Sequence, residues 1–208
     1  MLKTFLFSIF VTVMNAEAIK TILIDFLISQ NDSIILGSEV TYGSKKQVVK
    51  ISAFEIKADR DDVRRLDNQI NEYKKIFDYI YVVCTKKQLY KVQEKTDKTI
   101  GIFLIDDEER INIKRKALRQ RNADKRSILE TVNANYLKRT FNLNRRVTAN
   151  EARDLLTNKN AKELKNTLYT YLETFLSKKF SLFLSEKGIN THIDDLPVLS
   201  IHRRDIIL

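Results

Sequence analysis

The chain has 208 residues, a hydrophobic content of 43% and a charged content of 31%, which together describe an ordinary globular protein with one substantial core. Its formal net charge of +10 favours a polyanionic partner, nucleic acid first and an anionic membrane surface second. The single cysteine, Cys84, excludes an intrachain disulfide and a cysteine-based zinc site. Two histidines exclude a histidine-rich metal site.

The N-terminus imitates a secretion signal. An apolar run follows Lys3, and the sequence Ala-Glu-Ala at positions 16–18 is similar to a signal-peptidase site. The single cysteine argues against export, and the run is short for a membrane span. We therefore expect a cytoplasmic protein with no membrane association. In it, residues 1–13 form a hydrophobic extension packed on the domain, or translation starts at Met14.

The first half of the chain alternates helical and strand patterns. Apolar residues recur every three or four positions in the predicted helices, whereas the predicted strands are short and rich in β-branched and aromatic residues. The expected elements are a helix at 15–29, strands at 34–42 and 48–54 around a turn at 43–46, a helix at 63–77 opened by the acidic stretch 60–62, a strand at 79–84, a helix at 86–95 and a strand at 99–105. This order predicts an α/β fold, with a mixed sheet flanked by helices.

The pattern changes from Ile111 onward. A basic run with little apolar periodicity contains Lys114, Arg115, Lys116, Arg119, Arg121, Lys125 and Arg126. Helical patterns follow at 128–137, after a capping box of Thr148 and Glu151, at 164–176, and in a last helix that ends at Gly188. We therefore expect an α/β core at residues 1–112 and a basic, mostly helical region at 113–208.

Glu55 and Lys57 form the most informative pair of residues. Side chains of a strand alternate between its faces, so these two lie side by side at the end of a hydrophobic strand. There Glu55 could ligate a hard divalent cation, and Lys57 could hold an attacking water or offset negative charge, as phosphodiester hydrolysis requires. The alternative for an isolated Glu-x-Lys is a surface ion pair.

The residues around this pair resemble those of a known family. The stretch 55–59 (Glu-Ile-Lys-Ala-Asp), followed by Gln69 and Tyr73, resembles the acid-x-lysine strand and the Gln-x-x-x-Tyr helix of the RecB-like branch of the PD-(D/E)XK nuclease superfamily. Within that superfamily it is most similar to the uncharacterised bacterial sce7726 family. The resemblance runs from Met14 to the region of Leu176 and is sharp only over residues 53–78.

The resemblance implies a restriction-endonuclease-like core and a role for each matching residue. Glu55 would be a ligand of Mg²⁺ or Mn²⁺, with the Ile56 carbonyl as a further ligand, and Lys57 would be the catalytic lysine. Glu17 would be an auxiliary acid on the first helix. Gln69 and Tyr73 share a helix face and would position Lys57 or contact phosphate, although Tyr73 also suits a core position.

The sequence departs from the superfamily pattern at one position. The superfamily has an aspartate on the strand before the Glu-x-Lys strand, whereas residues 45–50 here contain no acid. Three explanations are open. Residues of the hairpin could be missing from the chain, Glu39 could supply the carboxylate, or the site could have lost catalysis and kept nucleic-acid binding.

We therefore expect a metal-dependent nuclease that acts on DNA, with RNA as the other substrate, and a homodimer is compatible with the sequence. The cations of the basic run would bind the phosphate backbone. The alternative function is a catalytically impaired nucleic-acid-binding protein on a nuclease scaffold.

Overall fold

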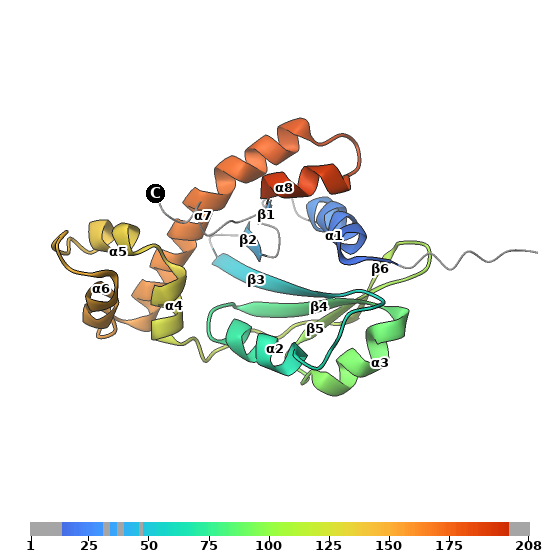
Figure 1. Cartoon of the computed structure of the whole chain (residues 1–208), viewed down its shortest axis with the longest axis horizontal. Helices are drawn as coiled ribbons and strands as arrows, with labels where there is room; N and C mark the ends of the chain where they lie inside the picture. The colour runs from blue at the N-terminus through green and yellow to red at the C-terminus, as the bar shows by residue number, and fades with distance from the viewer. Residues whose placement is uncertain (1–13, 31–33, 37–39, 46–47, 200–208) are drawn as a thin grey trace, which may run out of the picture.

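A mixed sheet of six strands forms the centre of the protein (Figure 1). The structure, a computed structural model, describes residues 14–30, 34–36, 40–45 and 48–199. The strands are β1 (Ile34–Leu36), β2 (Val40–Lys45), β3 (Val48–Lys57), β4 (Tyr79–Thr85), β5 (Gly101–Ile105) and β6 (Ile111–Arg115). They lie in the sheet in the order in which they occur in the chain.

The strand directions are mixed, and β3 is one of the two central strands. It pairs antiparallel with β2 and parallel with β4, while β4 is parallel to β5 and β5 antiparallel to β6. Parallel neighbours need a long crossover, which α2 (Leu66–Lys74) and α3 (Lys86–Lys95) provide. In the β3–β4 register, Glu55 lies beside Val82 and Lys57 beside Cys84. The two charged residues therefore share the sheet face of these apolar side chains.

Helices cover both faces of the sheet. Helix α1 (Ala16–Gln30) packs over the face that carries Phe54, Val83 and Phe103. Helices α2 and α3 pack over the other face, where Val82 and Cys84 belong to the apolar cluster. Burial raises the pKa of the Cys84 thiol to about 12, so this cysteine behaves as a small core residue, as its neighbours predict.

The remaining helices are α4 (Lys125–Thr131), α5 (Ala134–Thr140), α6 (Ala149–Leu156), α7 (Ala161–Glu186), a 3₁₀ turn (Ile193–Asp195) and α8 (Leu196–Leu199). Of these, α7 packs along the β1 end of the sheet, while α4, α5 and α6 form a group to one side of the sheet (Figure 1). Helix α7 contacts β1, β2 and β3 and also α4. The buried apolar side chains of its first part, up to Leu176, join those of α4, α5 and α6 in one apolar cluster that includes Ile51 of β3, whereas Phe180 and Phe183 pack with Leu36 and Leu199.

Asp78 links the sheet to α7. Its carboxylate is 1% exposed, accepts a hydrogen bond from the Ile51 amide at 3.0 Å and another from the Tyr169 hydroxyl at 2.9 Å. The ammonium of Lys165 lies 3.5 Å away, and the guanidinium of Arg119 lies 3.8 Å away. Burial lowers the pKa of Lys165, and Asp78 opposes that shift. The helical half is thus joined to the sheet by a buried polar network as well as by apolar packing.

The structure confirms the α/β class and most of the predicted elements of the first half. The predicted strand at 34–42 is wrong, because β1 and β2 are separate antiparallel strands, and β2 runs through the predicted turn to Lys45. The acidic stretch 60–62 does not cap a helix. Asp61 instead accepts from the Ala58 amide and Asp62 from the Arg64 amide, and α2 begins only at Leu66.

The second half differs from the prediction at three points. Residues Ile111–Arg115 form β6, so the sheet extends across the expected boundary between residues 112 and 113. The predicted helix at 128–137 is two helices, because Asn133 caps a new one with its side chain. The two expected C-terminal helices are one continuous helix, α7, of 26 residues.

The capping box predicted at the start of α6 is present. Thr148 Oγ1 accepts from the Glu151 amide at 3.3 Å, and the Glu151 carboxylate accepts from the Thr148 amide at 2.7 Å. Replacing Thr148 with alanine is expected to lower the free energy of unfolding by about 1 kcal/mol, because the first turn loses this acceptor. Urea unfolding followed by circular dichroism measures the loss. Thr174→Ala on the exposed face of α7 is the matched control and should change it by less than about 0.5 kcal/mol.

Asp97 makes the stability of the fold sensitive to acid. Partial burial alone would raise the pKa of Asp97, but the Lys74 ammonium at 2.6 Å and hydrogen bonds from Thr99 lower it to about 2, from an ordinary value of 3.8. A depressed carboxyl pKa contributes stability above the unfolded value, and this contribution is lost as the pH falls through the folded value. Asp97→Asn should therefore lose less unfolding free energy than the wild type between pH 4 and pH 2. Parallel urea-unfolding curves for the two proteins over that range would contradict this assignment.

Candidate active site

Strand β3 and helix α2 bring four of the predicted residues together. Glu55 and Lys57 lie on β3, and Gln69 and Tyr73 lie one turn apart on α2, which packs over the same face of the sheet. The Lys57 ammonium is 2.9 Å from Glu55 Oε1 and donates to Gln69 Oε1 at 3.1 Å. The Tyr73 hydroxyl donates to Glu55 Oε2 at 2.8 Å. The four side chains thus form one continuous polar network.

This network is buried. Glu55 is 8% exposed and Lys57 is 6% exposed, so the alternative of a surface ion pair is wrong. Burying two opposite charges is costly unless their remaining hydrogen-bonding capacity is satisfied, and here Gln69 and Tyr73 supply partners. Both oxygens of Glu55 are engaged by neighbours, which fixes the carboxylate in one orientation.

A pocket of about 510 Å³ opens directly on Lys57 and Gln69. Its other lining residues, Asp62, Arg64 and Arg65, come from the loop between β3 and α2. Arg64 pairs with Asp62 at 2.5 Å, whereas Arg65 is exposed. The site predicted from the sequence does not include these arginines, although two consecutive arginines directly before the Gln69 helix were the available signal.

The loop after β3 is fixed from two sides. The side-chain amide of Gln88, a buried residue of α3, donates to the carbonyls of Ala58 at 3.1 Å and Asp61 at 2.9 Å. From the other side, the Asp59 amide donates to the Met14 carbonyl at 3.5 Å. The loop that follows Lys57 is therefore held by hydrogen bonds to α3 on one side and to Met14, just before α1, on the other.

In the described part of the chain, no other predicted carboxylate ligand joins Glu55. Glu17 is exposed in the first turn of α1, which begins at the Lys57 end of β3 but covers the opposite face of the sheet. For Ile56 the predicted ligand is the backbone carbonyl, which adjoins Glu55 in β3, while its side chain packs in the apolar cluster under α1. Glu39 lies outside the described residues.

A divalent metal ion is implied by the resemblance, and Glu55 alone does not hold one. Hard cations take several oxygen ligands, and no group of three acidic, histidine or cysteine side chains that could bind a metal occurs among the described residues. Both oxygens of Glu55 already have a partner, since Oε1 pairs with the Lys57 ammonium and Oε2 accepts a hydrogen bond from the Tyr73 hydroxyl. The donor set in the described part of the chain therefore does not fit a complete metal site.

The predicted basic run serves two purposes. Four of its seven cations make contacts within the protein. Arg115 donates to the Ile100 carbonyl, Lys125 to the Thr157 carbonyl, and Arg126 to Glu130 and Asp154. The fourth, Arg119, is within 3.8 Å of Asp78, although its side chain is largely exposed. Lys114, Lys116 and Arg121 are exposed. The run therefore contributes fewer cations to the surface than its sequence predicts.

The fold and the site define an α/β protein with a buried Glu–Lys pair at the end of a central strand and a helical C-terminal region. A family model described as bacteriophage P4 protein cII matches residues 11–200, and the chain belongs to this family. Protein cII of Enterobacteria phage P4 is 35% identical over 52 residues, which are 25% of this chain and 20% of the phage protein. No solved structure matches the chain.

The described helices include none that is both long enough and apolar enough to cross a membrane.

Proposed function

We propose that the protein hydrolyses phosphodiester bonds in nucleic acid, with DNA as the first substrate to test, at the site formed by Glu55, Lys57, Gln69 and Tyr73. The observation that carries the proposal is the buried ion pair of Glu55 and Lys57, held by the Gln69–Tyr73 face of α2. These residues are also the ones on which the resemblance to the PD-(D/E)XK nucleases rests. The net charge of +10 adds affinity for a polyanion.

The pocket beside Lys57 gives the network access to a substrate. A phosphate placed in it would meet the Lys57 ammonium at its base and the arginine Arg65 at its rim. Lys57 would stabilise the negative charge that develops on the phosphoryl oxygens, and its position is fixed by Glu55 and Gln69 before the substrate binds. Tyr73 would keep Glu55 oriented through its hydroxyl.

A divalent cation would add Lewis-acid chemistry, and it would require carboxylates besides those of the described residues. Glu39 is the candidate from the sequence. The roles proposed here for Glu55, Lys57, Gln69 and Tyr73 therefore do not depend on a metal ion.

One observation favours a second candidate function, nucleic-acid binding without cleavage. Glu55 is the single carboxylate of the network, and both of its oxygens are engaged by other side chains. In that case the pocket beside Lys57 would bind phosphate and leave the phosphodiester bond intact.

One experiment separates the two functions. Purified full-length protein is incubated with supercoiled plasmid, linear duplex, single-stranded DNA and RNA, with Mg²⁺, with Mn²⁺ or with EDTA. Cleavage with either metal and none in EDTA supports the nuclease. Salt-sensitive binding without cleavage under every condition supports the binding protein and overturns the nuclease. Cleavage that persists in EDTA would show that metal ions are not required.

A further inference from the structure

We infer that the helical C-terminal region carries a second phosphate-binding site, built by α5 and the loop that follows it, which grips the nucleic-acid backbone away from Lys57. The inference rests on the proposed function, because it takes nucleic acid as the ligand. It differs from the sequence expectation, which placed backbone contacts in the run from Lys114 to Arg126.

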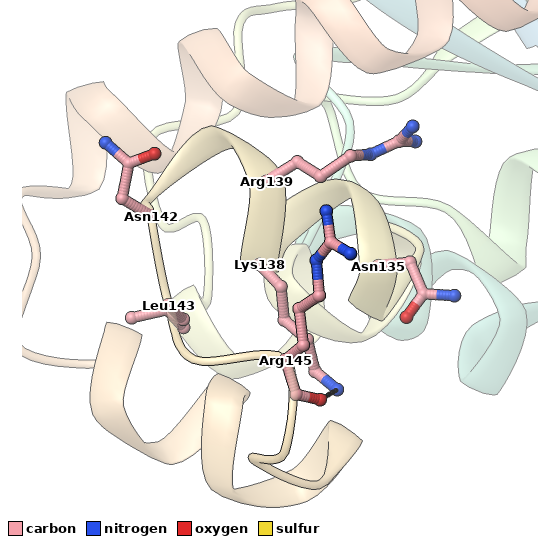
Figure 2. Close-up of a pocket in the computed structure, with 6 residues that line it drawn as sticks. All are labelled: Asn135, Lys138, Arg139, Asn142, Leu143 and Arg145. Carbon is pink, nitrogen blue, oxygen red and sulfur yellow. Dashed lines mark hydrogen bonds between the residues drawn. The ribbon is translucent and has the colours of Figure 1, made fainter.

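The site is a pocket of about 610 Å³ (Figure 2). It is lined by Asn135, Lys138, Arg139, Asn142, Leu143 and Arg145. Five of these six residues are polar or basic, and none is acidic. A site of this composition suits a hydrated anion better than an apolar ligand.

The basic side chains of the pocket come from two backbone segments, α5 and the loop after it. Asn135 and Arg139 lie one turn apart on α5 and therefore share a helix face. Arg145 reaches the same pocket from the loop, and the Lys138 ammonium donates to the Arg145 carbonyl at 3.4 Å, which ties the loop to the helix. Asn142, two residues after α5, has a positive φ of 52°, a conformation that asparagine tolerates. Figure 2 shows the side chains of Arg139 and Arg145 extended from these two segments.

The charges of the pocket are not neutralised by ion pairs. Among the residues that the structure describes, no carboxylate pairs with Lys138, Arg139 or Arg145, and both arginines are exposed. Glu151 is close enough to feel Lys138, but its carboxylate already accepts the Thr148 amide. Hydrogen bonds from Thr148 are the main cause of its lowered pKa, and the charge of Lys138 is a smaller one.

Both arginines of the pocket are exposed and available to phosphate, whereas only part of the cations of the basic run are. In the run, Arg115, Lys125 and Arg126 donate hydrogen bonds to other groups of the protein. Arginine can contact a phosphate with two parallel N–H groups, and the two arginines of the pocket come from segments tied together by Lys138. The asparagine amides can donate further hydrogen bonds to phosphate oxygens. A nucleic-acid strand bound here would be gripped by the helical region while the sheet domain acts on it.

The test compares binding of fluorescein-labelled 30-mer duplex and single-stranded DNA by anisotropy, in EDTA, between 50 and 300 mM NaCl. The double variant Arg139→Gln/Arg145→Gln should bind about tenfold more weakly or worse at 100 mM salt. The slope of log K against log salt should fall by about 1.8 for duplex, since each lost phosphate contact accounts for about 0.9. If the double variant loses more affinity for duplex than for single-stranded DNA, the site binds the duplex backbone, and the reverse result indicates single-stranded DNA.

Lys91→Gln/Lys98→Gln is the matched control, because it removes the same net charge from exposed positions on and after α3. If the arginine variant binds no more weakly than this control, the second site is wrong, even if the wild type cleaves DNA. If the arginine variant alone loses affinity and no protein cleaves, the second site stands and the nuclease proposal fails. Wild type that binds neither form of DNA would overturn both.

Discussion

Replacing Lys57 with methionine is expected to lower the rate of phosphodiester cleavage by about 100-fold or more, because the site loses the charge that stabilises the transition state. Methionine keeps most of the apolar volume of the side chain. The Lys57 ammonium also pairs with Glu55 inside the protein, so the single variant leaves a buried carboxylate with Tyr73 as its remaining partner. Breaking a buried pair in this way is expected to cost about 3–5 kcal/mol of unfolding free energy.

A double variant separates catalysis from stability. Glu55→Gln/Lys57→Met has no uncompensated charge, so it should recover a large part of the unfolding free energy that Lys57→Met loses, while cleavage stays at the level of the single variant. Cleavage is measured with saturating plasmid and stability by urea unfolding. Lys91→Met, on the exposed face of α3, controls for loss of a positive charge. If cleavage returned in the double variant, Lys57 would matter only for folding and the active-site assignment would be lost.

Asp78→Asn is expected to lower the free energy of unfolding by about 3 kcal/mol, because the buried ammonium of Lys165 loses its counter-charge. Asparagine can still accept the hydrogen bonds from Ile51 and Tyr169, but it leaves the ammonium of Lys165, whose side chain is 14% exposed, without a counter-charge. Because Asp78 joins β3 to α7, the helical half should detach from the sheet at a lower urea concentration than in the wild type. Circular dichroism and proteolysis of the C-terminal helices measure these two effects.

Two variants make the test of Asp78 specific. Asp62→Asn removes an exposed acid and should change the free energy of unfolding by less than about 0.5 kcal/mol. Asp78→Asn/Lys165→Met removes both charges and should be more stable than Asp78→Asn alone. Equal stabilities of the single and double variants would show that Lys165 is not the residue that needs the carboxylate.

The predictions that succeeded depend on local patterns. The strand at 79–84 and the helix at 86–95 could be predicted because the spacing of apolar residues in the sequence follows from which side chains are buried. The capping box of Thr148 and Glu151 was found because it is a contact between residues three positions apart. The pattern failed at β6 because this edge strand is largely exposed, Ile113 included, so its isoleucines mark no buried face and the strand merges with the basic run that follows.

The sequence by itself determined the four residues of the polar network, but not Arg64 and Arg65, which line the pocket beside it. Glu55 and Lys57 share a strand face, and Gln69 and Tyr73 share a helix face, because the periods of strand and helix are fixed by backbone geometry. Only the tertiary structure decided that these two faces meet, with Lys57 between Glu55 and Gln69. It also decided which cations remain available to a ligand. Whether a lysine or arginine pairs inside the protein depends on partners far away in the sequence, as Arg126 with Asp154 and Lys165 with Asp78 show, and no local pattern records such contacts.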